Sequence, residues 1–104
     1  MIVEERCYTL KPGQVGDYLA LYDAEGRVIQ ERILGHLIGF FHTDIGPLNQ
    51  VVHLWGYDDS NERARRRAEL WTDAGWLAFA DKALPLIETM ESKILIPAAF
   101  SPLR

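Results

Sequence analysis

Side chains suited to binding ligands or moving protons alternate along two short segments of the chain: Glu4, Arg6 and Tyr8 in the first, and His53, Trp55 and Tyr57 in the second. Alternate residues of a β-strand project from the same face of a sheet. If the two segments are neighbouring strands, these side chains share a face and line one cavity. A guanidinium, an imidazole, two phenols and an indole around a cavity suit a small aromatic or carboxylate-bearing molecule.

In such a cavity Arg6 pairs with the anionic group of the ligand. His53 is the one candidate for catalysis, because the unperturbed pKa of imidazole lies near neutrality. We therefore predict that the ligand contacts four residues: Arg6, Tyr8, His53 and Trp55. The alternative is that Arg6 pairs with Glu4 or Glu88 and that His53 is a buried histidine of the core or of an interface.

Other kinds of site find little support in the sequence. His36, His42 and Asp44 share a face of an unbroken strand, but their spacing does not bring three ligands around a metal ion. No histidine stands out as an axial ligand for haem, and Cys7 fits a buried structural cysteine better than a nucleophile. Phosphate-binding, dinucleotide-binding and serine-hydrolase motifs are absent. We expect neither a metal nor a cofactor.

Hydrophobic periodicity predicts the elements that must position these side chains. Runs with strand character occur at 2–10, 36–45, 50–57 and 93–97, and helical runs at 13–34, 59–71 and 75–91. Pro85 should kink the last helix. The order β-α-β-β-α-α-β predicts an α+β fold of the ferredoxin-like plan, with helices on one face of a four-stranded antiparallel sheet. We expect a single domain over residues 1–104.

Two features of the first two helical runs need an explanation. Gly26 lies on the apolar stripe of the first, where a glycine is costly, so either a close backbone approach to the sheet or a break in the helix is expected. Asp59 and Glu62 open the second with a pattern that resembles a capping box.

The second helical run also carries four arginines: Arg63, Arg65, Arg66 and Arg67. An acid-binding patch is one interpretation. Consecutive helical residues point about 100° apart, however, and Glu62 and Glu69 can pair with Arg66 and Arg65, which favours a solvated face. One arginine of the run then remains available to a pocket or a partner subunit. Trp71 and Trp76 flank the following break, either as a gate to the cavity or as core anchors.

Both faces of the predicted sheet carry large apolar groups. Phe40 and Phe41 are adjacent and must point to opposite faces. A monomer would expose the aromatic side chains of the uncovered face, which soluble monomers rarely do. We therefore predict a two-fold symmetric homodimer that packs through its sheet faces. The alternative is a monomer whose C-terminal tail folds over the sheet.

Composition and charge limit the partners and the cellular compartment that we expect for the protein. The formal net charge is −4, which argues against a general nucleic-acid binder. A single cysteine indicates a reducing compartment. The first ten residues lack the features of a signal or transit peptide, and no apolar run approaches the ~20 residues that cross a bilayer. We expect a cytoplasmic protein that contacts neither nucleic acid nor membrane.

Three segments resemble the NIPSNAP family: Glu5–Gly13, Ile38–Phe41 and Gly46–Asp58. The most specific part is the strand-turn-strand segment that ends in His-Leu-Trp-Gly-Tyr, and the resemblance spans nearly the whole chain. It implies a dimeric α/β-barrel built from ferredoxin-like subunits, in a family whose members share no established reaction. Relatives in the wider superfamily include small monooxygenases and isomerases, an analogy of fold alone.

The residues and the resemblance together predict a NIPSNAP-like homodimer of unassigned biochemical role. It binds a small aromatic or carboxylate-bearing molecule between sheet and helices. One alternative is a cofactor-independent monooxygenase or isomerase, in which His53 is the catalytic residue. A second alternative is a structural or adaptor dimer without a ligand.

Overall fold

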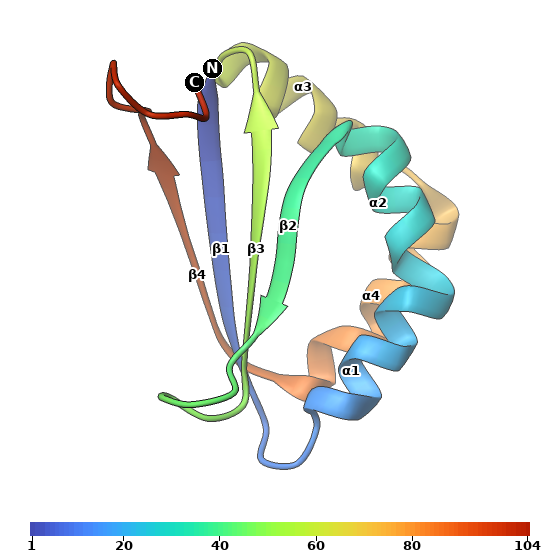
Figure 1. The fold of residues 1–104 in the computed structure, drawn as a ribbon. Helices are drawn as coiled ribbons and strands as arrows, with labels where there is room; N and C mark the ends of the chain where they lie inside the picture. The colour runs from blue at the N-terminus through green and yellow to red at the C-terminus, as the bar shows by residue number, and fades with distance from the viewer.

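The computed structural model describes all 104 residues. Its elements are β1 (Ile2–Leu10), α1 (Val15–Leu21), the π-helical turn η1 (Tyr22–Gly26), α2 (Arg27–Leu34), β2 (His36–His42), β3 (Gln50–Tyr57), α3 (Ser60–Leu70), α4 (Ala74–Ala83), the 3-10 turn η2 (Leu84–Leu86) and β4 (Ile87–Leu95). Figure 1 shows one sheet with every helix on the same side. The strand order is β2-β3-β1-β4, and all neighbouring pairs are antiparallel. The predicted α+β ferredoxin-like fold is confirmed.

The two central strands, β1 and β3, carry the side chains predicted to share a cavity. Arg6 lies opposite His53, and Glu4 lies opposite Trp55. Residues that are directly opposed in an antiparallel pair project from the same face. β1 ends before Pro12, which has no backbone N–H to donate to a ladder. The prediction that the two alternating sets share a face is therefore confirmed.

A bulge in β2 separates two histidines that the sequence placed on one face. His36 pairs with Gly56 and His42 pairs with Val51, and the register shifts between Leu37 and Gly39. The extra residue of a bulge inverts the alternation of side chains beyond it. His36 therefore points to the outer face of the sheet and His42 to the helix-covered face, so the expectation of a shared face was wrong.

The chain after α4 also differs from the sequence prediction. α4 ends at Ala83 instead of reaching Glu91, and the next three residues form a 3-10 turn around Pro85. β4 then begins at Ile87, six residues earlier than predicted, and pairs with β1 along its length. A proline ring clashes with the preceding helical turn. Here Pro85 ends the helix instead of kinking it. Pairing with β1 then provides hydrogen-bond partners for the backbone of the residues that follow.

The first helical run is continuous from residue 15 to 34 but contains the π-helical turn η1. A Cβ at Gly26 would lie 3.1 Å from the ring of Phe79 in α4. Gly26 therefore permits a close approach, to α4 and not to the sheet as expected. The same turn places Tyr22 so that its hydroxyl donates a hydrogen bond to Oε1 of Gln30, 2.6 Å away.

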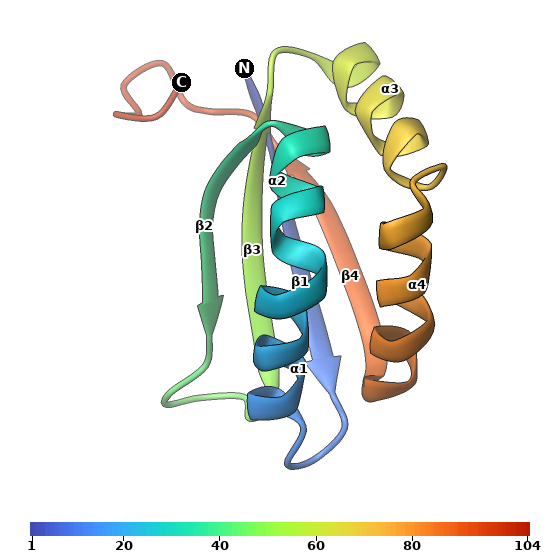
Figure 2. The same cartoon turned by 90° about the vertical axis from the view of Figure 1, so that its right-hand side faces the viewer.

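Both later helices begin at an aspartate that caps them. Asp59 accepts a hydrogen bond from the backbone N–H of Glu62, as predicted, while the Glu62 carboxylate accepts from the N–H of Asp58. Asp73 accepts from the backbone N–H of Trp76 at the start of α4. Figures 1 and 2 together show α1 and α2 as one column of helices and α3 and α4 as a second, both on the same side of the sheet.

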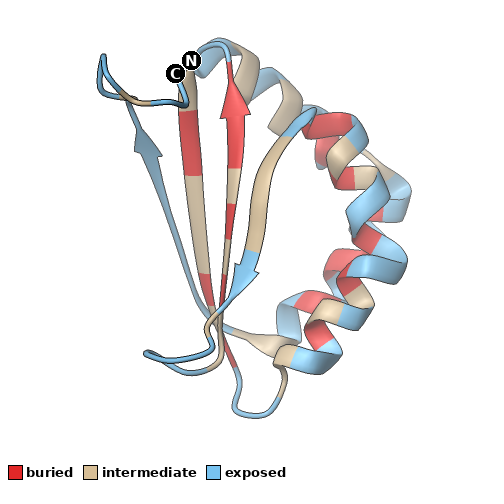
Figure 3. Cartoon of the chain, in the orientation of Figure 1, coloured by how far each residue is buried: buried red, intermediate tan, exposed pale blue.

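The core lies between these helices and the sheet. Its largest fully buried side chains include Trp55, Leu10, Leu34 and Leu70. Figure 3 shows that burial is concentrated in β1, β3 and the inward helix faces, whereas β4 is exposed over nearly its whole length. The helices therefore leave β4 open to solvent on the side where the candidate site lies.

The opposite face of the sheet is only partly covered. Phe40 stacks on His53 beneath the helices, whereas Phe41 points away and is 57% exposed. The C-terminal tail lies over one end of this outer face, where Pro97 and Leu103 line a shallow apolar pocket with Val3. The tail therefore does not hide the whole face.

Candidate functional site

A cavity opens between the sheet, the first helix column and α4. The volume of the cavity is about 40 Å³. Eleven of its fifteen lining residues are hydrophobic, and no aspartate or glutamate is among them. The cavity thus offers a small interior and an apolar entrance to a ligand without carboxylates of its own.

Three of the four residues predicted to contact a ligand lie on the cavity wall: Arg6, Tyr8 and His53. They come from the two central strands, as the alternation predicted. Trp55 does not line the cavity, since it is fully buried behind His53. Tyr18, Tyr22 and Gln30 face the same space from the first helix column.

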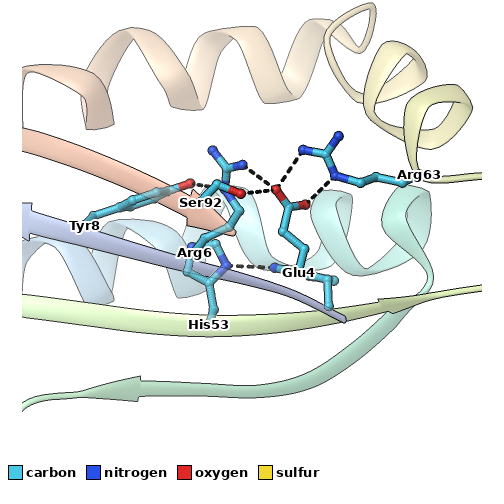
Figure 4. A network of polar contacts seen from close by, with 7 residues as sticks. Glu4, Arg6, Tyr8, His53, Arg63 and Ser92 are labelled. Atoms are coloured by element: carbon cyan, nitrogen blue, oxygen red, sulfur yellow. Dashed lines mark hydrogen bonds and ion pairs between the residues drawn. The ribbon is translucent and has the colours of Figure 1, made fainter. Parts of the chain in front are cut away.

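Arg6 is held by neighbours on its own strand (Figure 4). Its Nε donates to the Tyr8 hydroxyl at 2.8 Å, and a terminal nitrogen donates to Glu4 Oε2 at 2.9 Å. Glu4, one of the two alternative partners, is therefore the acid that pairs with Arg6. Because Arg6 is fixed between a carboxylate and a phenol, its remaining N–H groups reach the cavity in a defined orientation.

Glu4 is fully buried and carries the densest set of polar contacts in the chain. Arg63 of α3 donates to both of its oxygens, at 3.1 and 2.8 Å, and Ser92 of β4 donates to Oε2. Burial raises the pKa of the Glu4 carboxyl, but the hydrogen bonds from Arg63 and Ser92 and the charge of Arg6 outweigh it. The net effect lowers the pKa to about 2. Glu4 is therefore a permanently ionised structural anchor.

His53 lies on the cavity floor as a neutral imidazole. Its ring stacks on Phe40 with centroids 4.6 Å apart, and its Nδ1 accepts a hydrogen bond from Trp55 Nε1 at 2.7 Å. Burial, followed by the charge of Arg6, lowers the His53 pKa to about 3. An imidazole that accepts at Nδ1 and is neutral carries its proton on Nε2.

The Nε2 of His53 has no hydrogen-bond partner in the chain. A buried N–H left without an acceptor costs free energy, which a ligand oxygen would recover. The prediction of a catalytic His53 started from the unperturbed pKa of imidazole, whereas burial in the structure lowers the pKa of His53 far below neutrality. His53 is therefore suited to donate a hydrogen bond and is a poor base at neutral pH.

Trp55 acts on the cavity through His53 and is a positioning residue. We expect Trp55→Phe to lower the free energy of unfolding by about 2–3 kcal/mol, because it removes packed volume and leaves the buried His53 Nδ1 without a donor. Nitrogen-15 NMR of the imidazole should show the Nε2–H form in the wild type and a mixture of forms in the variant. The exposed Trp71→Phe is the matched control and should leave the His53 spectrum unchanged.

The four arginines of α3 do not form a solvated face. Arg63 binds Glu4, and Arg66 binds Glu62 at 2.8 Å and the backbone carbonyl of Ile33. Only Arg65 is exposed to solvent. The predicted pair of Glu62 and Arg66 is confirmed, whereas Arg63 departs from the predicted solvated face because α3 lies over the buried carboxylate of Glu4.

Arg67 is the arginine of this run that reaches the cavity. It is half-buried and forms none of the ion pairs of the chain. Burial and the nearby charge of Arg6 lower the pKa of its guanidinium from the ordinary value. The guanidinium of Arg67 therefore has no ion-pair partner. The only sequence feature that indicates its inward position is its spacing of four residues from Arg63, which places both arginines on one side of a helix.

The two tryptophans at the helix break both line the cavity. Their rings meet edge to face with centroids 6.1 Å apart. Trp76 is buried and its indole N–H has no acceptor in the chain, whereas Trp71 is exposed at the surface. The cavity therefore has two buried donors without partners, His53 Nε2–H and Trp76 Nε1–H, beside the unpaired Arg67.

No group of three or more His, Cys, Asp or Glu side chains is placed to hold a metal ion. None of the helices has the length and apolar character needed to span a bilayer.

Comparisons with known proteins identify the family. The NIPSNAP family model matches residues 3–102. The chain belongs to the NIPSNAP family. It is 39% identical to human Protein NipSnap homolog 2 over 107 residues and 37% identical to zebrafish Protein NipSnap homolog 1 over 103 residues. Each alignment covers 99% of this chain, which spans only 35% and 36% of the two relatives.

Solved structures place the fold in the same family. A NIPSNAP family protein of Agrobacterium tumefaciens superposes with a TM-score of 0.97 at 52% identity, covering 99% of this chain and 98% of that one. A putative antibiotic biosynthesis monooxygenase of Nitrosomonas europaea superposes with a TM-score of 0.67 at 13% identity, covering 96% of this chain and all of the other. The second likeness shows the shared fold alone. The NIPSNAP relatives carry no assigned biochemical role to transfer to this cavity.

Proposed function

We propose that this NIPSNAP chain binds a small organic anion, such as an aromatic or aliphatic carboxylate, in the cavity between sheet and helices. The observation that carries the proposal is Arg67, a half-buried guanidinium on a mainly apolar cavity wall that forms no ion pair of its own. His53 and Trp76 add two buried N–H donors to the same wall. Guanidinium and N–H donors are the groups that recognise the oxygens of a carboxylate.

The charge balance around the cavity supports an anion. Arg6 and Arg63 share the single carboxylate of Glu4, and Arg67 has no partner of its own. Three guanidiniums therefore face one carboxylate, which leaves an excess of two positive charges on this side of the sheet. An anion that enters the cavity gains favourable electrostatic energy from that excess, and more so because the walls are apolar.

Binding is favoured over proton-transfer catalysis by the state of the titratable groups. Glu4 ionises at a pKa of about 2 and His53 at about 3. A general base works best when its pKa lies near the operating pH. The cavity supplies hydrogen-bond donors and no such base.

Calorimetric titration with benzoate and its neutral isostere benzamide tests the anion site. We expect benzoate to bind at least about tenfold more tightly, as charge-assisted hydrogen bonds predict. We also expect the benzoate affinity to stay constant from pH 5 to pH 9, because both Glu4 and His53 titrate well below that range. Equal affinities for the two compounds would remove the basis for an anion site.

We further propose that the protein is a homodimer that buries the outer sheet face against a second copy. Support comes from Phe41, 57% exposed on that face, and from a tail that covers one end only. Sedimentation equilibrium should report twice the mass of 11.9 kDa, and Phe41→Glu should shift the distribution towards monomer. A wild-type monomer at micromolar concentration contradicts this pairing.

The single free Cys7 is consistent with a cytoplasmic location, which we include in the proposal.

A further inference from the structure

The mouth of the cavity is apolar. Among the lining residues, Trp71, Leu84 and Met90 are between 43% and 46% exposed, so they mark where the cavity meets solvent. Trp71 follows α3, Leu84 begins η2 and Met90 lies on the inner face of β4. Exposed apolar groups gathered around an entrance favour a ligand with apolar surface of its own.

The interior is small and accepts oxygen atoms. A free volume of about 40 Å³ holds a group the size of a carboxylate together with little else. Two of the lining residues, His53 and Trp76, carry buried N–H donors without partners, and the Arg67 guanidinium beside them forms no ion pair. The Gln30 side-chain oxygen already accepts from Tyr22. An ammonium group would find no carboxylate on these walls.

Resting on the proposed anion site, we propose that the ligand class is an amphipathic monocarboxylate, bound with its carboxylate in the interior and its hydrocarbon portion across the mouth. The interior is too small for both parts of such a molecule, and the mouth provides apolar contacts along its sides. Met90 adds an unbranched, adaptable side chain that fits tails of different shape. A second carboxylate at the far end of the ligand would lie against Trp71, Leu84 and Met90, where no cationic side chain compensates its charge.

The test is a titration of the purified full chain with acetate, butanoate, hexanoate, octanoate and hexanedioate. We expect the affinity to rise roughly two- to fourfold per added methylene as apolar area leaves water. Hexanedioate should bind at least about tenfold more weakly than hexanoate, because its second charge meets the apolar mouth. Affinities that do not change with chain length, or a dicarboxylate that binds as tightly as hexanoate, overturn the assignment.

A pair of variants separates this inference from the anion site itself. Leu84→Gln combined with Met90→Gln should reduce octanoate affinity about tenfold and leave acetate affinity unchanged. Leu77→Gln is the matched control, since Leu77 is an exposed leucine of α4 outside the cavity. If the double variant binds octanoate like the wild type, the tail does not lie across the mouth, while the anion site stands. If no carboxylate of any length binds, both proposals fail.

Discussion

Replacing Glu4 by alanine is expected to lower the free energy of unfolding by about 3–5 kcal/mol, the largest effect of any single polar substitution in this chain. The carboxylate is fully buried and accepts hydrogen bonds from Arg6, Arg63 and Ser92. Its removal leaves the guanidinium of Arg6 largely shielded from water without a counter-charge. Urea unfolding followed by tryptophan fluorescence measures the difference.

An exposed carboxylate on the helices provides the control for that experiment. Glu25 lies in η1, where its side chain meets Lys82 of α4 at 2.8 Å near solvent. Exposed ion pairs of this kind contribute about 0–1 kcal/mol. Glu25→Ala should therefore change stability by less than about 1 kcal/mol. Equal losses from the two substitutions would mean that the ion network around Glu4 does not stabilise the fold.

The same carboxyl predicts a pH dependence of stability. Its pKa falls from the ordinary value of 4.5 to about 2 in the folded chain. Between those values the unfolded chain binds more protons than the folded one, so the free energy of unfolding decreases as the pH falls. The contribution of Glu4 is complete above about pH 4.5 and is lost as the pH approaches 2. Glu4→Gln should flatten this part of the stability curve.

The architecture of the site was predictable from local sequence patterns, because strand alternation depends only on backbone geometry. Period-two spacing in β1 and β3 placed Arg6, Tyr8 and His53 on one face, and the register confirms it. The bulge that separates His36 from His42 has no comparable signal, since Gly39 fits a regular strand as well as a bulged one. Features that depend only on local backbone geometry could therefore be predicted from the sequence, whereas features that depend on pairing with a neighbouring strand could not.

The helix-to-strand boundary after α4 shows the same limit. Ile87 and Met90 continue the helical spacing of Trp76, Phe79 and Ala83, so periodicity extended the helix past Pro85. In the structure Ile87 and Met90 still line the cavity, but from β4. Both apolar side chains favour burial equally in a helix and in a strand, so their type does not distinguish the two. Only pairing with β1, which lies some eighty residues away in the sequence, decides between them.

The charge states of the site depend on burial, which the sequence does not reveal. His53 has an imidazole pKa of about 3 because the helices and Phe40 exclude water from it, and not because of any adjacent residue in the chain. In the same way, Arg63 and Arg67 look alike in the sequence. One is neutralised by Glu4, and the other is left without a partner beside the cavity.

That contrast between two arginines one helical turn apart gives the second large expected effect. Arg67→Met keeps the apolar stem and removes the charge. We expect it to weaken benzoate and octanoate binding roughly 10- to 100-fold, since a charge-assisted hydrogen bond contributes about 1.5–3 kcal/mol. The free protein should keep its stability or gain up to about 1 kcal/mol, because a partly desolvated charge with no partner is unfavourable to folding.

Arg63→Met is the matched comparison and should show the opposite pattern. It breaks the two hydrogen bonds to Glu4, so the free energy of unfolding should fall by about 2–3 kcal/mol. Anion affinity should change far less than in Arg67→Met, because Arg63 does not line the cavity. Calorimetry measures the anion affinity of both variants, and urea unfolding measures their stability, so each variant is compared on both quantities. A loss of stability in Arg67→Met without a loss of anion binding would identify Arg67 as a structural residue. It would contradict the proposed site, because that site requires the charge of Arg67 to contribute to anion affinity.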